Sequence, residues 1–160
     1  LESSIDLGLL FDPGLVPGIL SEKLARGRLF VLALPDGPFA GRESLTIADL
    51  AGQPFISLDR RGPLGRLLSK HVDASGIHLN IVAYSETYQV AKSMVAHGAG
   101  ITIADEITAR SSDHQNVKLW PLEPEIGFQI SALHAEKAPL SLFVQDFKAF
   151  LGERIREFVQ

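Results

Sequence analysis

Apolar and polar positions along the chain follow two spacings, one typical of short buried strands and the other typical of helices packed on a sheet. Short apolar runs rich in Ile, Val, Leu and Phe predict strands. They lie at residues 5–11, 19–24, 29–34, 54–58, 78–84, 100–104, 117–122 and 127–133. Amphipathic spacing or helix-start residues predict helices at residues 46–51, 64–75, 86–97, 105–110 and 141–151. Because strands and helices alternate along most of the chain, we expect an α/β fold with parallel strands and right-handed crossovers.

Specific turn and capping residues mark several of these boundaries. The segment Ala25-Arg26-Gly27-Arg28 separates two strand-like runs and predicts a hairpin turn. Thr46 is followed three residues later by Asp49, which is close to the capping box that begins many helices. Ser85 precedes the amphipathic run 86–97, and we expect its side chain to cap that helix.

The junction at residues 93–105 is the most informative stretch of the sequence. Gly98 and Gly100 follow the last apolar positions of a predicted helix, where a helix needs a residue that tolerates positive φ in order to end. The β-branched run Ile101-Thr102-Ile103 then predicts a strand. A chain could cross between two lobes here, and the break at residues 35–38 is a second candidate crossover.

Composition narrows the class of protein. The chain has 160 residues, 46% hydrophobic and 21% charged, which is enough for one compact core or two small lobes. A net charge of −4 gives no support to binding DNA by neutralising phosphates. The absence of cysteine excludes disulfides, thiolate catalysis and cysteine-bound metals. We find no long apolar span and no secretion leader, so we expect a cytoplasmic protein.

Five short motifs, taken in order, resemble the effector-binding domain of LysR-type transcriptional regulators, whose fold is that of two-lobed periplasmic binding proteins. They are Ile5–Leu9, Leu29–Pro35 with Phe39-Ala40, Leu45–Phe55, Val95–Ile103, and Pro139–Ser141 with Phe147–Leu151. The resemblance implies two Rossmann-like lobes, each a mixed, mostly parallel sheet flanked by helices. It places lobe I at residues 1–34 with 104–160, and lobe II at residues 35–103.

The resemblance also implies what this sequence does not contain. Members of the family begin with a winged helix-turn-helix and a linker helix, and their effector domain opens with a strand, a helix and a strand. This sequence begins after those elements, at the motif Ile5–Leu9. We therefore expect lobe I to expose a sheet edge and apolar surface.

The function that the resemblance implies is that of a sensor without catalytic activity. A small metabolite would bind between the lobes and rearrange a homo-dimer or tetramer on DNA, through a DNA-binding domain that is absent from this sequence. No cofactor and no membrane partner is implied. The amphipathic helix at residues 64–75 is the expected pairing surface, and the alternative is a surface helix without a partner.

Candidate ligand contacts lie where strands end and helices begin, since these positions face the cleft of open α/β sheets. They are Phe11, Ser57, Arg60, Arg61, Thr87, Gly100 and Thr102. Two adjacent guanidinium groups could hold a carboxylate, so we hypothesise a small organic acid or amino-acid derivative as the ligand. The alternatives are a solvated basic loop for the arginines, simple capping for Thr87 and a core position for Phe11.

Other chemistry finds little support in the sequence. The five histidines show no metal-ligand spacing, and no motif of a hydrolase, a phosphate-binding loop or a zinc protease occurs. We interpret the adjacent Asp105 and Glu106 as acidic residues at a helix start. Two alternatives stay open: a solute-binding protein of a transporter, which would carry a secretion leader, and an enzyme on the same two-lobed fold, which would carry a catalytic acid or base in its cleft.

Overall fold

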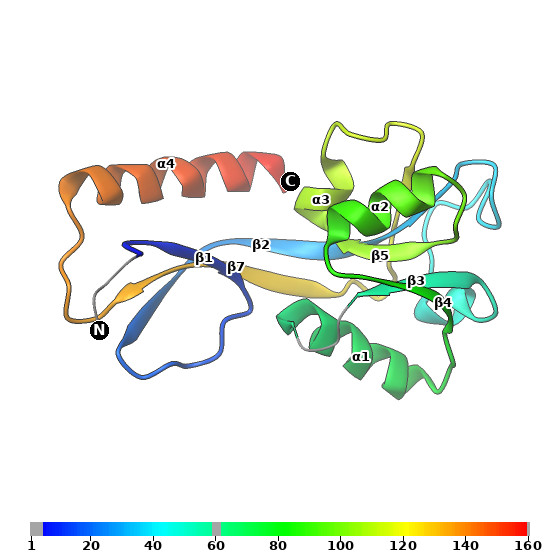
Figure 1. Ribbon diagram of the computed structural model, residues 1–160, viewed down its shortest axis with the longest axis horizontal. Coiled ribbons are helices and arrows are strands. Elements are labelled where there is room, and N and C mark those ends of the chain that lie inside the picture. The colour runs from blue at the N-terminus through cyan, green and yellow to red at the C-terminus, as the bar shows by residue number, and fades with distance from the viewer. Residues whose placement is uncertain (1–4, 59–61, 160) are drawn as a thin grey trace. The chain divides into compact units, whose positions relative to one another are not determined.

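The computed structural model describes residues 5–58 and 62–159, and the chain forms two compact units (Figure 1). Unit 1 comprises Leu1–Gly27 with Phe128–Gln160, and unit 2 comprises Arg28–Gly127. One boundary between the units falls inside the strand Ile19–Ala33, and the other falls at the start of the strand Gly127–Ala135. The lobe boundaries expected after residues 34 and 103 stay a prediction.

Unit 1 is a small antiparallel sheet with one long helix. Its elements are β1 (Gly8–Phe11), the first part of β2 (Ile19–Ala33), β7 (Gly127–Ala135) and α4 (Leu142–Phe158). β7 lies between β1 and β2, and β1 pairs with it in antiparallel register. β1 is therefore at the edge of this sheet.

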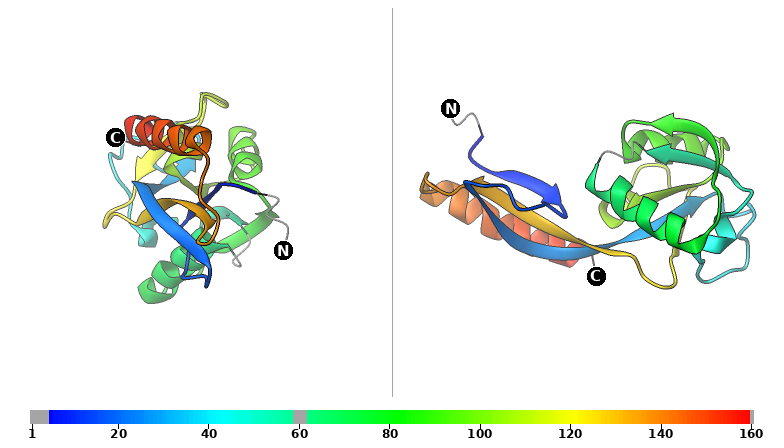
Figure 2. Two further views of the ribbon diagram at one scale, coloured as in Figure 1. Left: turned by 90° about the vertical axis from the view of Figure 1, so that its left-hand side faces the viewer. Right: turned by 90° about the horizontal axis from the view of Figure 1, so that it is seen from below.

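Helix α4 runs alongside β2, as Figure 2 shows for unit 1. The Arg156 guanidinium donates to the carbonyl oxygen of Leu24 at 3.0 Å, and Lys148 forms an ion pair with Glu22. The helix begins at Ser141, whose hydroxyl accepts a hydrogen bond from a backbone N–H one turn later. The predicted helix at 141–151 is thus confirmed and extends seven residues further, to residue 158.

The predicted hairpin turn at residues 25–28 is wrong, because this segment is extended and belongs to the continuous strand β2. Leu24 and Ala25 are buried there. Gly27 lies against the ring of Phe128, and a Cβ at this position would come within 2.7 Å of that ring. The glycine therefore makes room for an aromatic side chain of the neighbouring strand and does not form a turn.

Unit 1 exposes several large apolar side chains. Leu9 and Leu10 on the edge strand β1 are 41% and 43% exposed. Phe143 on α4 is 78% exposed, and Phe147 and Phe150 on the same helix are also exposed. An apolar face of this kind is uncommon on the surface of a monomeric protein.

Unit 2 contains the remaining elements of the chain. These are the second part of β2, the 3₁₀ helix η1 (Ile47–Leu50), β3 (Pro54–Leu58), α1 (Pro63–Ser75), β4 (Asn80–Ser85), α2 (Tyr88–Ala96), β5 (Thr102–Asp105), α3 (Glu106–Arg110) and β6 (Lys118–Pro121). β3 pairs with β4 in parallel, whereas β2 pairs antiparallel with β5 and with β6. The α/β class with mixed sheets is confirmed. Fewer pairs are parallel than expected, because the long strand β2 runs opposite to its neighbours.

Alternate residues of β3 face opposite sides of the sheet, as strand geometry requires. Ile56 is fully buried in a core cluster with Ala91 and Val95 of α2. Its neighbours Phe55 and Ser57 point to the other side, where α1 lies (Figure 1). Unit 2 is therefore a three-layered arrangement, with α2 on one face of the sheet and α1 on the other.

The predicted helix-to-strand junction at residues 93–105 is confirmed. Gly98 has φ 79° just after α2, and Gly100 has φ 149° just before β5. A Cβ on Gly100 would lie 2.3 Å from the carbonyl oxygen of Pro54. Ile101 N donates to that same oxygen at 2.8 Å, so the glycine allows the start of β5 to approach β3 closely.

Candidate functional site

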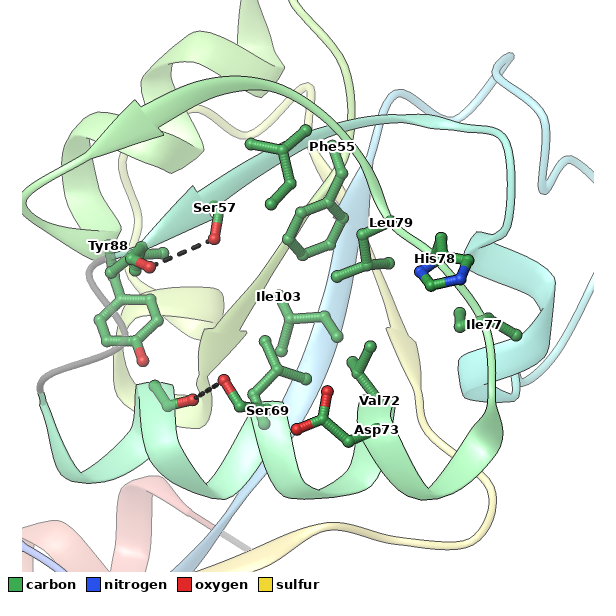
Figure 3. A pocket seen from close by; sticks show the side chains of 14 residues that line it. Phe55, Ser57, Ser69, Val72, Asp73, Ile77, His78, Leu79, Tyr88 and Ile103 are labelled. Carbon is green, nitrogen blue, oxygen red and sulfur yellow. Dashed lines mark hydrogen bonds between the residues drawn. The ribbon is translucent and has the colours of Figure 1, made fainter.

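A cavity of about 220 Å³ lies between α1 and the sheet of unit 2 (Figure 3). Most of its wall is apolar, and the side chains come from β3, α1, the segment that leads into β4, β4 itself, α2 and β5. The apolar wall includes Phe55, Leu68, Val72, Leu79, Ile81 and Ile103. A sheet covered by a helix would ordinarily close such a space with side chains.

Helix α1 is positioned by clear start and stop residues, and its predicted range is confirmed. Gly62 is the N-cap and Pro63 follows as the first helical residue, where its missing N–H is not needed. The helix ends at Gly76, which has φ 69°. Leu64 and Val72 on the inner face are 3% and 8% exposed, so the helix does pack on the sheet at both ends of the cavity.

The cavity is partly open to solvent. A molecule that filled it would displace water from the apolar wall, which is favourable, so the cavity is a natural place for a ligand to bind.

Two serine hydroxyls lie on the cavity wall, and both are hydrogen-bonded to backbone. Ser57 Oγ donates to the carbonyl oxygen of Leu58 at 3.2 Å. Ser69 Oγ donates to the carbonyl oxygen of Gly65 at 2.8 Å. Figure 3 shows both bonds as dashed lines. Since the Ser57 hydroxyl uses its hydrogen on the protein, its oxygen can act only as an acceptor toward a ligand.

Tyr88 is the first residue of α2, and its ring lies on the cavity wall near Ser57 (Figure 3). Its hydroxyl has no hydrogen-bond partner among the described residues. Burial, assisted by the negative charge of Asp105, raises the pKa of Tyr88 well above its usual range. The hydroxyl therefore stays protonated and can donate a hydrogen bond to a ligand.

Asp73 and His78 complete the polar part of the wall, toward the end of the cavity formed by the last turn of α1 (Figure 3). Asp73 has interaction partners of its own. Its carboxylate nevertheless brings negative charge to this side of the cavity. The described wall includes no lysine or arginine side chain.

Of the predicted ligand contacts, Ser57 lies on this cavity and is 8% exposed. Thr87 is the N-cap of α2, and its Oγ1 accepts a hydrogen bond from Val90 N at 3.2 Å. The prediction that Ser85 caps this helix is wrong. Ser85 ends β4, and its hydroxyl donates to the Thr87 carbonyl at 2.8 Å, so the strand continues further and the helix begins later than expected.

Gly100 lies just before β5 and Thr102 is its first residue, and both hold the strand close to β3. Thr102 is fully buried, and its Oγ1 donates to the carbonyl oxygen of Ile56 at 2.8 Å. Gly100 is in close contact with Pro54. Both residues thus have a structural role, and their contact with a ligand stays a prediction.

The remaining predicted contacts are not part of the cavity wall as described. Phe11 belongs to unit 1, where its ring packs on Phe128 with 5.0 Å between ring centroids. Arg60 and Arg61 lie outside the described residues. The carboxylate-binding role assigned to the two arginines therefore stays a prediction.

Two buried carboxylates stabilise the start of α3. Asp105 is its N-cap and accepts hydrogen bonds from Thr108 N at 3.0 Å and Thr108 Oγ1 at 2.7 Å. Glu106 is 1% exposed and pairs with Arg110 at 2.9 Å and with Arg28 at 3.7 Å. The interpretation of both residues as acids at a helix start is confirmed.

Lys92 on α2 is 1% exposed, an unusual position for a lysine. Its Nζ donates to the carbonyl oxygens of Thr108, Ala109 and Ser111 at 3.1, 3.2 and 2.9 Å, and to Ser111 Oγ at 3.0 Å. Burial lowers the pKa of Lys92, and the negative charge of Asp113 partly offsets this. The ammonium group thus caps the C-terminal end of α3.

Sequence reasoning missed Tyr88, Ser69, Asp73 and His78 as residues of the cavity wall. Ser69 and Asp73 are four residues apart, on the same face of the amphipathic helix as Leu68 and Val72. That spacing was a usable signal for both. The burial of the Tyr88 ring depends on how α1 and α2 pack on the sheet, and no local pattern predicts it.

Within residues 5–58 and 62–159, no three or more His, Asp or Glu side chains gather closely enough to hold a metal ion. In the same part of the chain, no helix is both long enough and apolar enough to cross a bilayer.

Comparison with known proteins identifies related sequences over nearly the whole chain. The family model for the LysR substrate binding domain matches residues 1–156. The HTH-type transcriptional regulator DgcR of Pseudoalteromonas sp is 34% identical over 154 residues, which cover 96% of this chain and 52% of DgcR. The regulatory protein NocR of Agrobacterium tumefaciens is 24% identical over 151 residues, 94% of this chain and 50% of NocR. The chain therefore spans about half the length of these relatives.

Solved structures share the fold. The regulatory domain of Synechocystis PCC6803 CcmR, in complex with 2-PG, matches 96% of this chain and 76% of its own with a TM-score of 0.82 at 16% identity. The effector binding domain of QuiR, in complex with shikimate, matches 96% of this chain and 75% of its own with a TM-score of 0.81 at 23% identity. At these identities the likeness concerns the fold.

Proposed function

Because this chain belongs to the LysR substrate-binding domain family, we propose that it is the part of a transcriptional regulator that binds a small-molecule effector. The family match over residues 1–156 is the observation that carries the proposal. Two structures with the same fold are named as complexes with small molecules, shikimate and 2-PG. Effector binding would change the action of the protein at DNA by favouring one of two conformational states.

The partners and the cellular location follow from this role. We propose that the protein acts as a homo-dimer or tetramer, that it reaches DNA through a segment outside the matched residues, and that it works in the cytoplasm. The two-lobe division at residues 1–34 with 104–160 and 35–103, and the effector position that this division implies, belong to the same proposal.

We further propose that the chain senses its ligand without changing it chemically. The buried carboxylates Asp105 and Glu106 would be the obvious acid–base pair for an enzyme. Both are engaged in hydrogen bonds and ion pairs that hold α3, and neither lines the cavity. This arrangement supports structural roles for the two residues.

A reporter assay tests the proposed function. The intact gene product that carries this chain is produced in bacteria beside a fluorescent reporter driven by the DNA upstream of its own gene, and a panel of small molecules is added. We expect at least one compound to change the reporter signal by roughly fivefold or more, the lower end of typical allosteric coupling. Cells without the protein are the control. A protein that neither binds this DNA nor changes its response with any compound would contradict the proposal.

A further inference from the structure

We propose that the middle of the cavity between α1 and the sheet of unit 2 binds a six-membered hydrocarbon ring, as a whole molecule or as one group of a larger one. The described side chains that line the cavity all belong to unit 2. The inference therefore goes beyond the proposed function, because it does not depend on an effector position between lobes. It rests on the arrangement of the apolar wall, on its hydroxyl groups and on the volume that they enclose.

Three neighbouring strands form an apolar floor. Phe55 of β3 is the register partner of Ile81 of β4. On its other side β3 lies against the start of β5, where Phe55 forms a bridge with Ile101, and Ile103 follows two residues later on the same face. Ile81, Phe55 and Ile103 all line the cavity, and Phe55 and Ile103 are each 1% exposed. The floor is thus a continuous apolar surface across three strands.

Helix α1 supplies the opposite wall. Leu68 and Val72 are four residues apart, so they lie on the same face of the helix, and both line the cavity. Figure 3 shows Phe55 and Ile103 on the sheet side of the cavity and Val72 on α1 opposite them. A ring between these walls would contact apolar side chains on both of its faces, and removing its surface from water there is favourable.

The serine hydroxyls of the wall do not require a polar atom on the ring. Ser57 and Ser69 donate their hydrogens to backbone carbonyls at 3.2 and 2.8 Å. A polar ring atom between the apolar floor and α1 would give up its hydrogen bond to water without a replacement from Phe55, Ile103 or Val72, and that loss is unfavourable. The middle of the cavity therefore favours a hydrocarbon ring.

The volume fits one ring. The cavity measures about 220 Å³. An engineered apolar cavity of about 150 Å³ in another protein binds benzene. This cavity therefore has room for a six-membered ring with a small substituent. Because it is partly open to solvent, a longer substituent can extend out of it.

Calorimetric titration of the intact gene product with two ring probes tests this inference. The probes are fluorobenzene and 3-fluoropyridine, which has the same shape but carries a polar ring nitrogen that is uncharged at neutral pH. We expect fluorobenzene to bind about tenfold more tightly, because the nitrogen loses its hydrogen bond to water inside the cavity. The inference is overturned if fluorobenzene gives no heat of binding up to its solubility limit, or if 3-fluoropyridine binds as tightly.

Two neighbouring residues of β4 provide a matched pair of variants. Ile81 lines the cavity and is 38% exposed, whereas Val82 is 51% exposed and is not part of the described wall. Ile81→Ser should weaken fluorobenzene binding by about fivefold through the loss of apolar contact, and Val82→Ser should leave it unchanged. Ser69→Leu adds volume to the wall and should abolish binding. Equal affinities of the two β4 variants overturn the inference, and this pair decides the matter even if Ser69→Leu does not fold.

The outcomes for the inference and for the proposed function can be told apart. A reporter that responds to some compound, with no heat from fluorobenzene, overturns the inference and leaves the sensing role intact. Binding of fluorobenzene that depends on Ile81, together with a reporter that responds to nothing, supports the inference and contradicts the proposed function.

Discussion

Replacing Lys92 with methionine should strongly destabilise the protein. Methionine keeps the length of the side chain but removes the ammonium group, which donates to three backbone carbonyls and to one hydroxyl from a position that is 1% exposed. Each buried acceptor left without a donor costs about 1–3 kcal/mol. Methionine carries no charge, so the cost of burying the ammonium group disappears and offsets part of this loss. We expect a net decrease of about 3 kcal/mol in the free energy of unfolding.

Urea unfolding followed by circular dichroism measures this loss as a change in the free energy of unfolding. For a chain of this length, the expected loss corresponds to a drop in Tm of about 6–12 °C. Lys70→Met is the matched control, because Lys70 is an exposed helical lysine and its replacement should change stability by less than about 0.5 kcal/mol. If the two variants unfold at the same urea concentration, the ammonium group does not cap α3 as described.

The pH dependence of the same comparison provides a second check. Because the pKa of Lys92 is lowered in the folded state from its usual 10.5, the folded protein releases this proton before the unfolded protein does. The unfolded state then binds more protons between the lowered value and pH 10.5, and stability rises with pH in this window. The advantage of the wild type over Lys92→Met should therefore grow as the pH approaches 10.5 from below. An advantage that shrinks over this range would refute burial as the cause.

Three further substitutions test other parts of unit 2. Asp49→Asn should lower the free energy of unfolding at pH 7 by about 1 kcal/mol, because it weakens the cap of η1. The hydrogen bond from Thr46 N lowers the pKa of Asp49 below 3.8. The difference from wild type should therefore vanish in acid unfolding curves as the pH falls through that lowered value. Gly100→Ala should cost about 3 kcal/mol or more, because its Cβ would meet the Pro54 carbonyl oxygen, and a thermal melt that matches wild type would show that β5 can move away. Thr102→Val should cost about 1 kcal/mol in urea unfolding by removing the donor to Ile56, and an unchanged midpoint would contradict that bond.

The sequence predicted the elements of this fold well wherever local signals and burial agree. Helix α1 is bounded by Pro63 and Gly76, and η1 begins with the pair Thr46 and Asp49, as expected from turn and capping rules. The strand β2 shows where such rules fail. Gly27 suggested a turn, but a glycine is needed there because the ring of Phe128 leaves no room for a Cβ, and Phe128 lies about one hundred residues further along the chain.

The candidate site was predictable only in part. Ser57 was expected at a strand end and does line the cavity. The cavity and the place of Tyr88 on its wall were not predicted. Both depend on the distance between α1 and the sheet, and the periodicity of side chains carries no information about that distance. Lys92 was missed for a related reason, since its burial depends on α3, which follows it by more than ten residues.

The exposed phenylalanine rings of α4 and the edge strand β1 have a practical consequence at the bench. A polypeptide with such a face adheres to phenyl resin and to itself as its concentration rises. Titrations should therefore be run dilute, with light scattering recorded alongside, so that heat released by clustering of copies is not counted as heat of ligand uptake.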